Sequence, residues 1–141
     1  RMSSEEIGAQ IGLSASACQR RIKKLKAGGY IKKEVAVLDE TKFKGLVTVI
    51  VDVTLEVGGE QALDKMLGVL NQTPQVQQIY YVSGEADFVV ILICQNMAEF
   101  DQLSRKLFMS QDNIKRFSSK IVIQSSKVET FLPLTKANLQ F

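Results

Sequence analysis

Apolar and polar residues alternate along the chain from residue 46 to residue 57. Six apolar side chains fall at every second position from Val47 to Val57, and the intervening positions are mostly polar. Successive side chains of a strand point to opposite faces, so this pattern predicts a half-buried β-strand. Apolar patterns also predict strands at residues 76–83, 87–94 and 121–123. The run FVVILI within 87–94 is apolar throughout, so we expect both faces of that strand to be covered.

Two segments between these strands carry apolar residues at helical spacing. Residues 60–71 and residues 97–109 each place four large apolar side chains on one helical face, at positions 63, 66, 67 and 70 and at positions 100, 103, 107 and 108, which predicts amphipathic helices. The resulting order over residues 46–134 is β-α-β-β-α-β, the order of a ferredoxin-like domain. The fold class is therefore α+β, with both helices on one face of a four-stranded sheet. We expect a second copy of the sheet to cover the other face.

The first 33 residues carry a different pattern, that of two short helices. Ser3 and Glu6 form a capping-box sequence, which predicts a helix start. Gly12 breaks that helix, Ser14 is a favourable N-cap for a second one, and Gly28-Gly29 ends it. A helix, a glycine-containing turn and a second helix are the components of the helix-turn-helix motif, whose second helix enters the DNA major groove.

The second predicted helix has one apolar face and one basic, amide-rich face. Ala15, Cys18, Ile22 and Leu25 form the apolar stripe. Hydroxyl, amide and guanidinium groups near its N-terminal half can reach base edges, whereas lysines suit phosphates. The candidate DNA-contacting residues are Ser14, Ser16, Gln19, Arg20, Arg21, Lys23 and Lys24.

The charge of the chain is unevenly distributed. Residues 1–33 hold eight cations and two anions, a charge of +6, and the remainder holds 10 cations and 13 anions, a charge of −3. Residues 14–33 contain no acid, whereas ordinary surface helices interleave Glu with Lys. This favours a DNA-binding helix; a solvated cationic face is the alternative.

Composition argues against several classes of function. The chain has no His, and its two cysteines are 76 positions apart and outside any CxxC motif. Zinc sites and histidine acid/base catalysis are therefore disfavoured, and an enzyme is the least favoured class. We expect Cys18 and Cys94 to be buried free thiols. No apolar run approaches roughly 20 residues, so a soluble cytoplasmic protein without a membrane partner is expected.

Three segments, in this order and at this spacing, resemble the Lrp/AsnC family, the feast/famine transcription regulators of bacteria and archaea. IGLSASACQRRIKKLKAGGYI, residues 11–31, resembles the turn and recognition helix of that family. VSGEADF, residues 82–88, resembles its Gly-x-x-Asp turn, and SKIVIQSSKVETFLPL, residues 119–134, resembles its last strand and tail.

The resemblance implies a particular domain organisation. Residues 1–33 would be a winged-type helix-turn-helix, incomplete because the first helix of the family should precede Arg1. Residues 34–45 would be a linker strand and hinge, with a strand candidate at 33–38. Residues 46–134 would be an effector-binding and oligomerisation domain, and residues 135–141 a tail. Dimers assembling into tetramers or octamers, and binding double-stranded operator DNA at the nucleoid, are implied.

The resemblance also implies a free amino acid as effector, bound between dimers at the Gly-x-x-Asp turn. The family tends to place two Thr residues before its last strand, where this chain has Phe117 and Ser119. Phe117 departs from that pattern and favours an apolar effector such as leucine or methionine, with no other cofactor. A plain hairpin turn is the alternative for residues 84–87. The candidate effector-binding residues are Ser83, Gly84, Asp87 and Ser119.

The favoured function is a DNA-binding regulator of amino-acid metabolism or transport genes. Two alternatives stay open at this point: an amino-acid sensor that does not bind DNA, and an effector-independent nucleoid-organising protein that wraps DNA. The second would show steep salt dependence with little discrimination between sequences.

Overall fold

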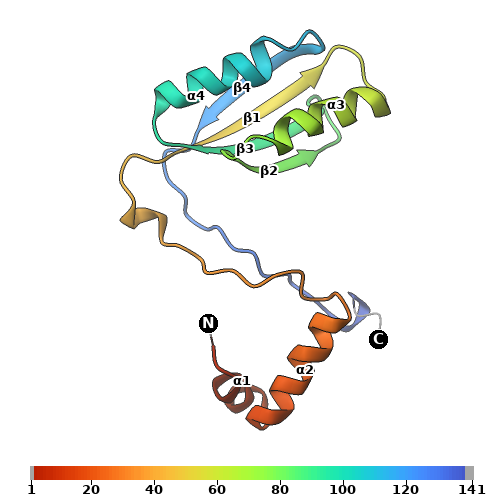
Figure 1. Cartoon of the computed structure of the whole chain (residues 1–141), viewed down its shortest axis with the longest axis vertical. Helices are drawn as coiled ribbons and strands as arrows, with labels where there is room; N and C mark the ends of the chain where they lie inside the picture. The colour runs from red at the N-terminus through yellow and green to blue at the C-terminus, as the bar shows by residue number, and fades with distance from the viewer. Residues whose placement is uncertain (1, 139–141) are drawn as a thin grey trace. The chain divides into compact units, whose positions relative to one another are not determined.

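The chain divides into two compact units, with the boundary between Lys42 and Phe43. The computed structural model describes residues 2–138 (Figure 1). The first unit is helical, and the second contains the sheet.

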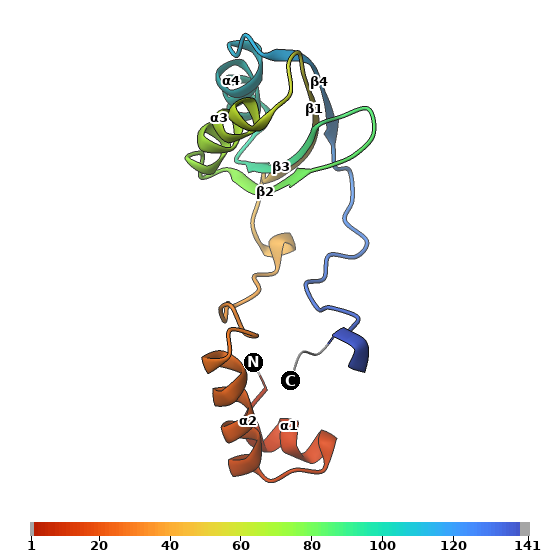
Figure 2. The same cartoon turned by 90° about the vertical axis from the view of Figure 1, so that its right-hand side faces the viewer.

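The first unit contains two helices, α1 (Ser4–Ile11) and α2 (Ala15–Ala27), joined by a short turn (Figure 2). The predicted capping box is present, because the Ser3 hydroxyl accepts from the Glu6 amide and the Glu6 carboxylate accepts from the Ser3 amide. Gly12 ends α1 in the left-handed conformation, with φ of 74°. Ser14 caps α2, which ends at Ala27 just before the two glycines, and both predicted helices are thus confirmed.

The apolar stripe of α2 faces into the unit. Cys18 is buried, and Ala15, Ile22 and Leu25 are half-buried. Met2, Ile7, Ile22 and Ile31 line an open groove beside the two helices. The helix expected before Arg1 lies outside the described residues, as do residues 139–141 of the expected tail.

The predicted strand at residues 33–38 is wrong. This segment is extended, but no neighbouring strand pairs with it among residues 2–138, and the only regular element of the linker is the 3₁₀ turn η1 (Glu40–Lys42). Val37 is 85% exposed. A strand needs a partner for its backbone groups, and β-branched composition alone does not supply one.

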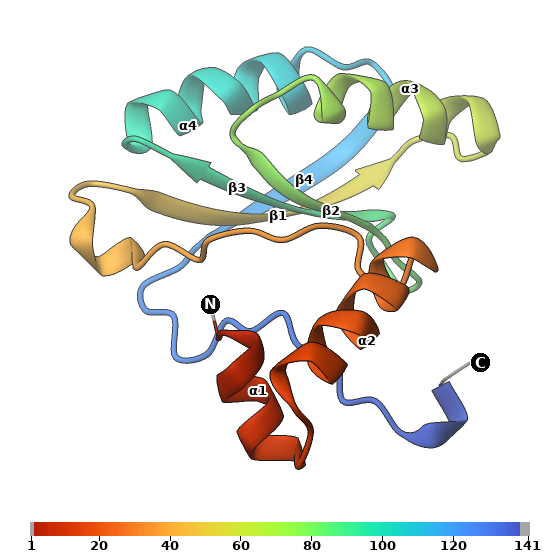
Figure 3. The same cartoon turned by 60° about the horizontal axis from the view of Figure 1, so that its bottom comes forward.

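The second unit has the predicted β-α-β-β-α-β order. The elements are β1 (Val47–Leu55), α3 (Glu60–Asn71), β2 (Val76–Tyr81), β3 (Phe88–Cys94), α4 (Met97–Ser104) and β4 (Ile114–Ile121). The sheet has the strand order β2-β3-β1-β4, and every neighbouring pair is antiparallel. Helices α3 and α4 cover one face (Figure 3).

The core lies between the sheet and these two helices. Val49, Val51 and Val53 of β1 are fully buried, as are alternate residues of β3 from Phe88 to Leu92, which confirms the alternation predicted for β1. The opposite face of β3 carries Val89, Ile91 and Ile93, which are half-buried in the single chain. We call this uncovered side, with its neighbours on β1, β2 and β4, the open sheet face.

Two further predictions need correction. The helix expected over residues 97–109 is α-helical only to Ser104 and continues as a π-helical turn, η2 (Arg105–Met109). The last strand begins at Ile114, seven residues before the predicted Ile121, and Ile123 lies beyond it with its side chain 99% exposed. As an edge strand, β4 buries few side chains, so its sequence IKRFSSKI lacks a strong apolar pattern.

Candidate DNA-binding and effector sites

All seven residues predicted to contact DNA lie on α2 or at its N-cap, and all are exposed. The Ser14 hydroxyl accepts from the Ala17 amide at 3.2 Å and lies 3.2 Å from the Ser16 hydroxyl. Ser14 therefore has a structural role as a cap, whereas Gln19, Arg20 and Arg21 project from the body of the helix.

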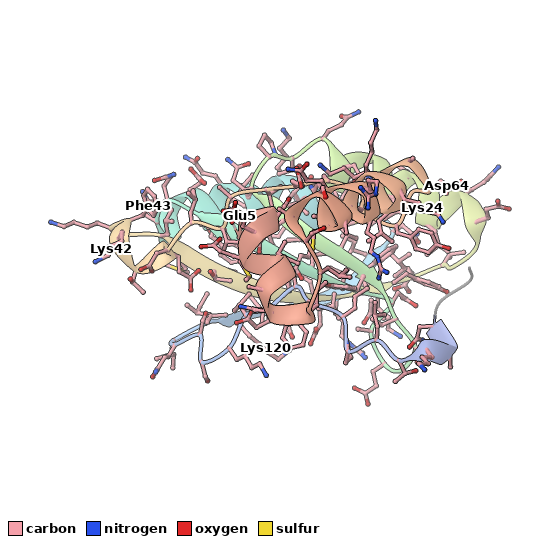
Figure 4. All side chains as sticks on the ribbon, turned by 90° about the horizontal axis from the view of Figure 1, so that it is seen from below. Glu5, Lys24, Lys42, Phe43, Asp64 and Lys120 are labelled. Atoms are coloured by element: carbon pink, nitrogen blue, oxygen red, sulfur yellow. The ribbon has the colours of Figure 1, made fainter. Side chains whose placement is uncertain are left out.

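The cations of α2 are available to an outside anion. Within residues 2–138, Arg20, Arg21, Lys23 and Lys24 form no ion pair (Lys24 is labelled in Figure 4). Lys26, at the end of α2, pairs with Glu34 at 3.2 Å. Clustered cations without carboxylate partners suit the phosphate backbone of nucleic acid.

Gly8 positions α2 and was missed by the sequence reasoning. It is buried in α1, and its carbonyl accepts from the Leu13 amide at 2.8 Å. A Cβ at this position would lie 2.2 Å from the Leu13 carbonyl oxygen, far closer than two such atoms can approach. Only glycine lets the turn cross α1 so closely. A glycine inside a predicted helix, four residues before the glycine of the turn, was the available signal.

The turn between β2 and β3 is closed at residues 82 and 87. The Val82 amide donates to the Asp87 carbonyl at 3.0 Å, and Gly84 adopts φ of 109°. Side chains other than glycine rarely adopt that conformation. Ser83 and Gly84 are exposed at the tip, which leaves the backbone of the turn accessible.

Asp87 joins this turn to the end of β1. Its Oδ2 accepts from the Leu55 amide at 2.7 Å, and its own amide donates to the Val53 carbonyl at 2.8 Å. The Thr54 hydroxyl donates to the Glu85 carbonyl at 3.3 Å. A carboxylate has about four acceptor positions, so Asp87 can hold the fold together and still accept from a ligand.

Asn113 holds the end of β1 from the other side, and the sequence reasoning did not identify it. Its side chain donates to the Val57 carbonyl and accepts from the Val57 amide, both at 2.9 Å. The Glu56 amide donates to the Asn113 carbonyl at 2.7 Å. Nothing in the local sequence signals these contacts.

Ser119 is not brought next to the turn. It pairs with Val51 of β1, which pairs with Val90 of β3, three residues beyond Asp87. Ser119 is therefore about 10 Å across the sheet and about 10 Å along it from Asp87. Phe117, the departure from the expected Thr, packs against Phe108 with ring centroids 5.2 Å apart and helps to fill the core.

Neither cysteine belongs to a reactive site. Both are buried free thiols, as predicted. Burial and the nearby Glu99 carboxylate raise the pKa of the Cys94 thiol, which keeps it protonated and unreactive.

Among the residues that the structure describes, no group of three or more His, Cys, Asp or Glu could hold a metal ion. No helix in that part of the chain is long and apolar enough to span a bilayer.

Comparison with known families identifies a domain in each unit of the chain. The chain matches the AsnC-type helix-turn-helix domain over residues 1–26 and the Lrp/AsnC ligand binding domain over residues 48–131. The chain belongs to the Lrp/AsnC family. As a member of that family it is a DNA-binding transcriptional regulator with a ligand-binding domain, and not an enzyme, as predicted.

Three known proteins illustrate the Lrp/AsnC relationship. The chain is 34% identical to an HTH-type transcriptional regulator of Sinorhizobium fredii over 134 residues, which are 95% of this chain and 79% of the relative. It is 33% identical to the glutamate uptake regulatory protein of Zymomonas mobilis over 94% of this chain and 80% of the relative. A Neisseria meningitidis transcriptional regulator solved with L-Met has the same fold, with a TM-score of 0.84 and 22% identity over 94% and 86% of the two chains.

Proposed function

We propose that this regulator controls genes of amino-acid metabolism or transport, and that a free amino acid bound at residues 83–87 changes its DNA binding. The observation that carries the proposal is the turn itself, which is exposed at Ser83 and Gly84 and fixed to the sheet by Asp87 within the ligand-binding domain. Its setting would be the cytoplasm, on nucleoid DNA.

The chemistry of the turn suits the backbone groups of an amino acid. The Asp87 carboxylate can accept from an α-ammonium group as well as from Leu55, and Gly84 permits close approach to the turn backbone. Apolar effectors such as leucine or methionine are favoured, and the L-Met complex of the Neisseria regulator supports this class. The relative named for glutamate uptake makes glutamate the main competing outcome.

Self-association completes the proposed site. Ser119 lies two strands from the turn, so the two can share one small effector only if they come from different copies of the chain. Dimers would form through the open sheet face, whose centre is apolar and whose β4 side carries the ion pair between Lys120 and Asp52 (Figure 4 labels Lys120). Assembly of dimers into tetramers or octamers would then bring turn and Ser119 together.

The first test is a thermal-shift screen of the protein against the twenty amino acids, with particle mass followed by light scattering. A ligand that binds only the folded state raises the midpoint, by about 2.7 kcal/mol of stabilisation at a hundredfold excess over Kd. We expect a shift with an apolar amino acid. A folded, oligomeric protein that responds to none of the twenty would refute the effector proposal and favour effector-independent DNA organisation.

The variant Asp87→Asn tests whether the amino acid binds at the Asp87 carboxylate. The amide oxygen of the substituted side chain can still accept from the Leu55 amide, whereas the negative charge offered to an ammonium group is lost. We expect a melting temperature close to wild type, an unchanged oligomer, and no shift with the amino acid that stabilises the wild type. A variant that responds like wild type would remove the Asp87 charge from the binding site.

A further inference from the structure

The end of β1 is held by side chains from both sides of the strand. On the β3 side, the Asp87 carboxylate accepts from the Leu55 amide. On the β4 side, the Asn113 side chain exchanges two hydrogen bonds with the backbone of Val57, two residues further on. The two side chains therefore bind backbone groups two residues apart, one at the last residue of β1 and one in the bend that follows it.

The contacts of Asn113 lie where the backbone has little other support. Regular pairing between β1 and β4 ends at Leu55 opposite Ile114, with a register irregularity at Thr54 and Leu55. Gly58 and Gly59 follow Val57, and neither would meet any atom within 4 Å if a Cβ were added. Helix α3 then starts without a side-chain cap. Between Leu55 and α3, the hydrogen bonds of Asn113 hold the backbone at residues 56 and 57.

The same segment supports the candidate effector turn. Val53 and Leu55 hold Asp87 through its amide and its carboxylate, and Thr54 holds the Glu85 carbonyl. Displacement of β1 beyond residue 53 would move two of the hydrogen bonds that fix residues 85–87, those made by Thr54 and Leu55. A residue that fixes the strand end thus also fixes the turn, although it touches no part of it.

We propose that Asn113 is a positioning residue for the effector site: it holds the strand end at residues 56–57 and, through β1, keeps the 83–87 turn in the geometry that binds an amino acid. The binding part of this inference rests on the function proposed above. The positioning part concerns contacts within the chain and can be measured without any effector.

The test compares Asn113→Ala with Asn96→Ala. Asn96 also makes a side-chain hydrogen bond to a backbone amide, capping α4 by accepting from Glu99 at 2.8 Å. It lies beyond the opposite end of β3 from Asp87. Each variant loses an asparagine side chain bonded to backbone, so each is expected to lower the melting temperature by about 5 °C. Only Asn113→Ala should disturb the turn.

The first readout is amide hydrogen exchange at Leu55 and Asp87, measured by NMR well below the melting temperature. We expect exchange to accelerate by about tenfold in Asn113→Ala and to stay at the wild-type rate in Asn96→Ala. If the Leu55 and Asp87 amides exchange as slowly in Asn113→Ala as in wild type, the proposal is overturned, since the turn would then be fixed independently of Asn113.

The second readout is the calorimetric Kd for L-methionine and L-leucine. We expect Asn113→Ala to bind about tenfold more weakly than wild type, and Asn96→Ala to bind like wild type. Unchanged affinity in Asn113→Ala would overturn its role in binding. If the wild type binds neither amino acid while the exchange result holds, the assignment of an apolar effector fails and the positioning of the turn stands.

Discussion

At the scale of single residues, Gly8 shows how one missing side chain lets the turn between two helices pass close to the first helix. In a helix interior, alanine is ordinarily more favourable than glycine by about 1 kcal/mol. At Gly8 this preference is reversed, because a Cβ would lie 2.2 Å from the Leu13 carbonyl oxygen, and a backbone atom cannot swing aside. The turn that directs α2 therefore depends on glycine at this position.

Gly8→Ala is expected to destabilise the helical unit by about 2–3 kcal/mol, within the range for overpacking. Gly68→Ala is the matched control, since Gly68 lies exposed in α3 and a Cβ added there would meet no atom within 4 Å. Alanine at position 68 should raise the free energy of unfolding by at most about 1 kcal/mol. Urea unfolding followed by circular dichroism measures the stability of both variants, and amide exchange, in α1 and α2 for Gly8→Ala and in α3 for Gly68→Ala, assigns each change to its unit. A Gly8→Ala protein as stable as wild type would contradict the close contact at Leu13.

The residues of the candidate sites were predictable to unequal degrees. Gly84 and Asp87 stand in a short recognisable turn, so their positions followed from local sequence. Asn113 did not, because its side chain bonds to Val57, 56 positions earlier in the chain. Hydrogen bonds between residues so far apart depend on the assembled sheet, and a single asparagine in a loop carries no signal of them.

At the scale of elements, the helices and strands that were predicted correctly are those with the strongest local sequence pattern. Helices α1 and α2 were predicted because caps, glycines and a one-sided apolar stripe all agree there. The position of strand β4 was predicted wrongly because the apolar run at residues 121–123 has the stronger strand pattern. The strand instead uses Ile114 and Phe117 as its inward residues, and its pairing ends as the Val122 amide donates to the Thr48 carbonyl.

The basic face of α2 makes a prediction at this scale. Arg21→Ala should weaken binding to an operator selected in vitro by about tenfold or more, since a guanidinium can make bidentate contacts to guanine. Lys24→Ala should weaken binding across all sequences and lower the salt slope by about one. Lys65→Ala, at an exposed position of α3 in the other unit, is the control and should leave both the affinity and the salt slope unchanged. Full affinity in Arg21→Ala, measured by fluorescence anisotropy, would show that α2 does not read this DNA through Arg21.

At the scale of the whole molecule, the sheet has two unlike faces. One is closed by α3 and α4, and the open sheet face carries half-buried aliphatic side chains at its centre. A single copy leaves these side chains in contact with water, and burial by a second copy would contribute about 25 cal/mol for each Å² of apolar surface removed. The strand predicted to be apolar on both faces thus indicates where association should occur.

Ile91→Lys is expected to dissociate the proposed dimer, because an ammonium group in the centre of a buried interface lacks a partner. Gln102→Lys, on the exposed side of α4, adds the same charge away from the open sheet face. Light scattering coupled to gel filtration gives the masses, and circular dichroism verifies that each variant is folded. A folded Ile91→Lys protein with the same mass as wild type would place the dimer contact elsewhere.

Because both thiols are buried, a dye can be attached selectively to a new cysteine in either unit. Cys18 lies in the helical unit and Cys94 in the sheet unit, and neither side chain is accessible to a dye in the folded chain. New cysteines placed on exposed positions, one in each unit, would therefore be the only fast-reacting ones. Donor and acceptor fluorophores on such a pair would report the distance between the DNA-binding helices and the ligand-binding sheet in single molecules, with and without an amino acid.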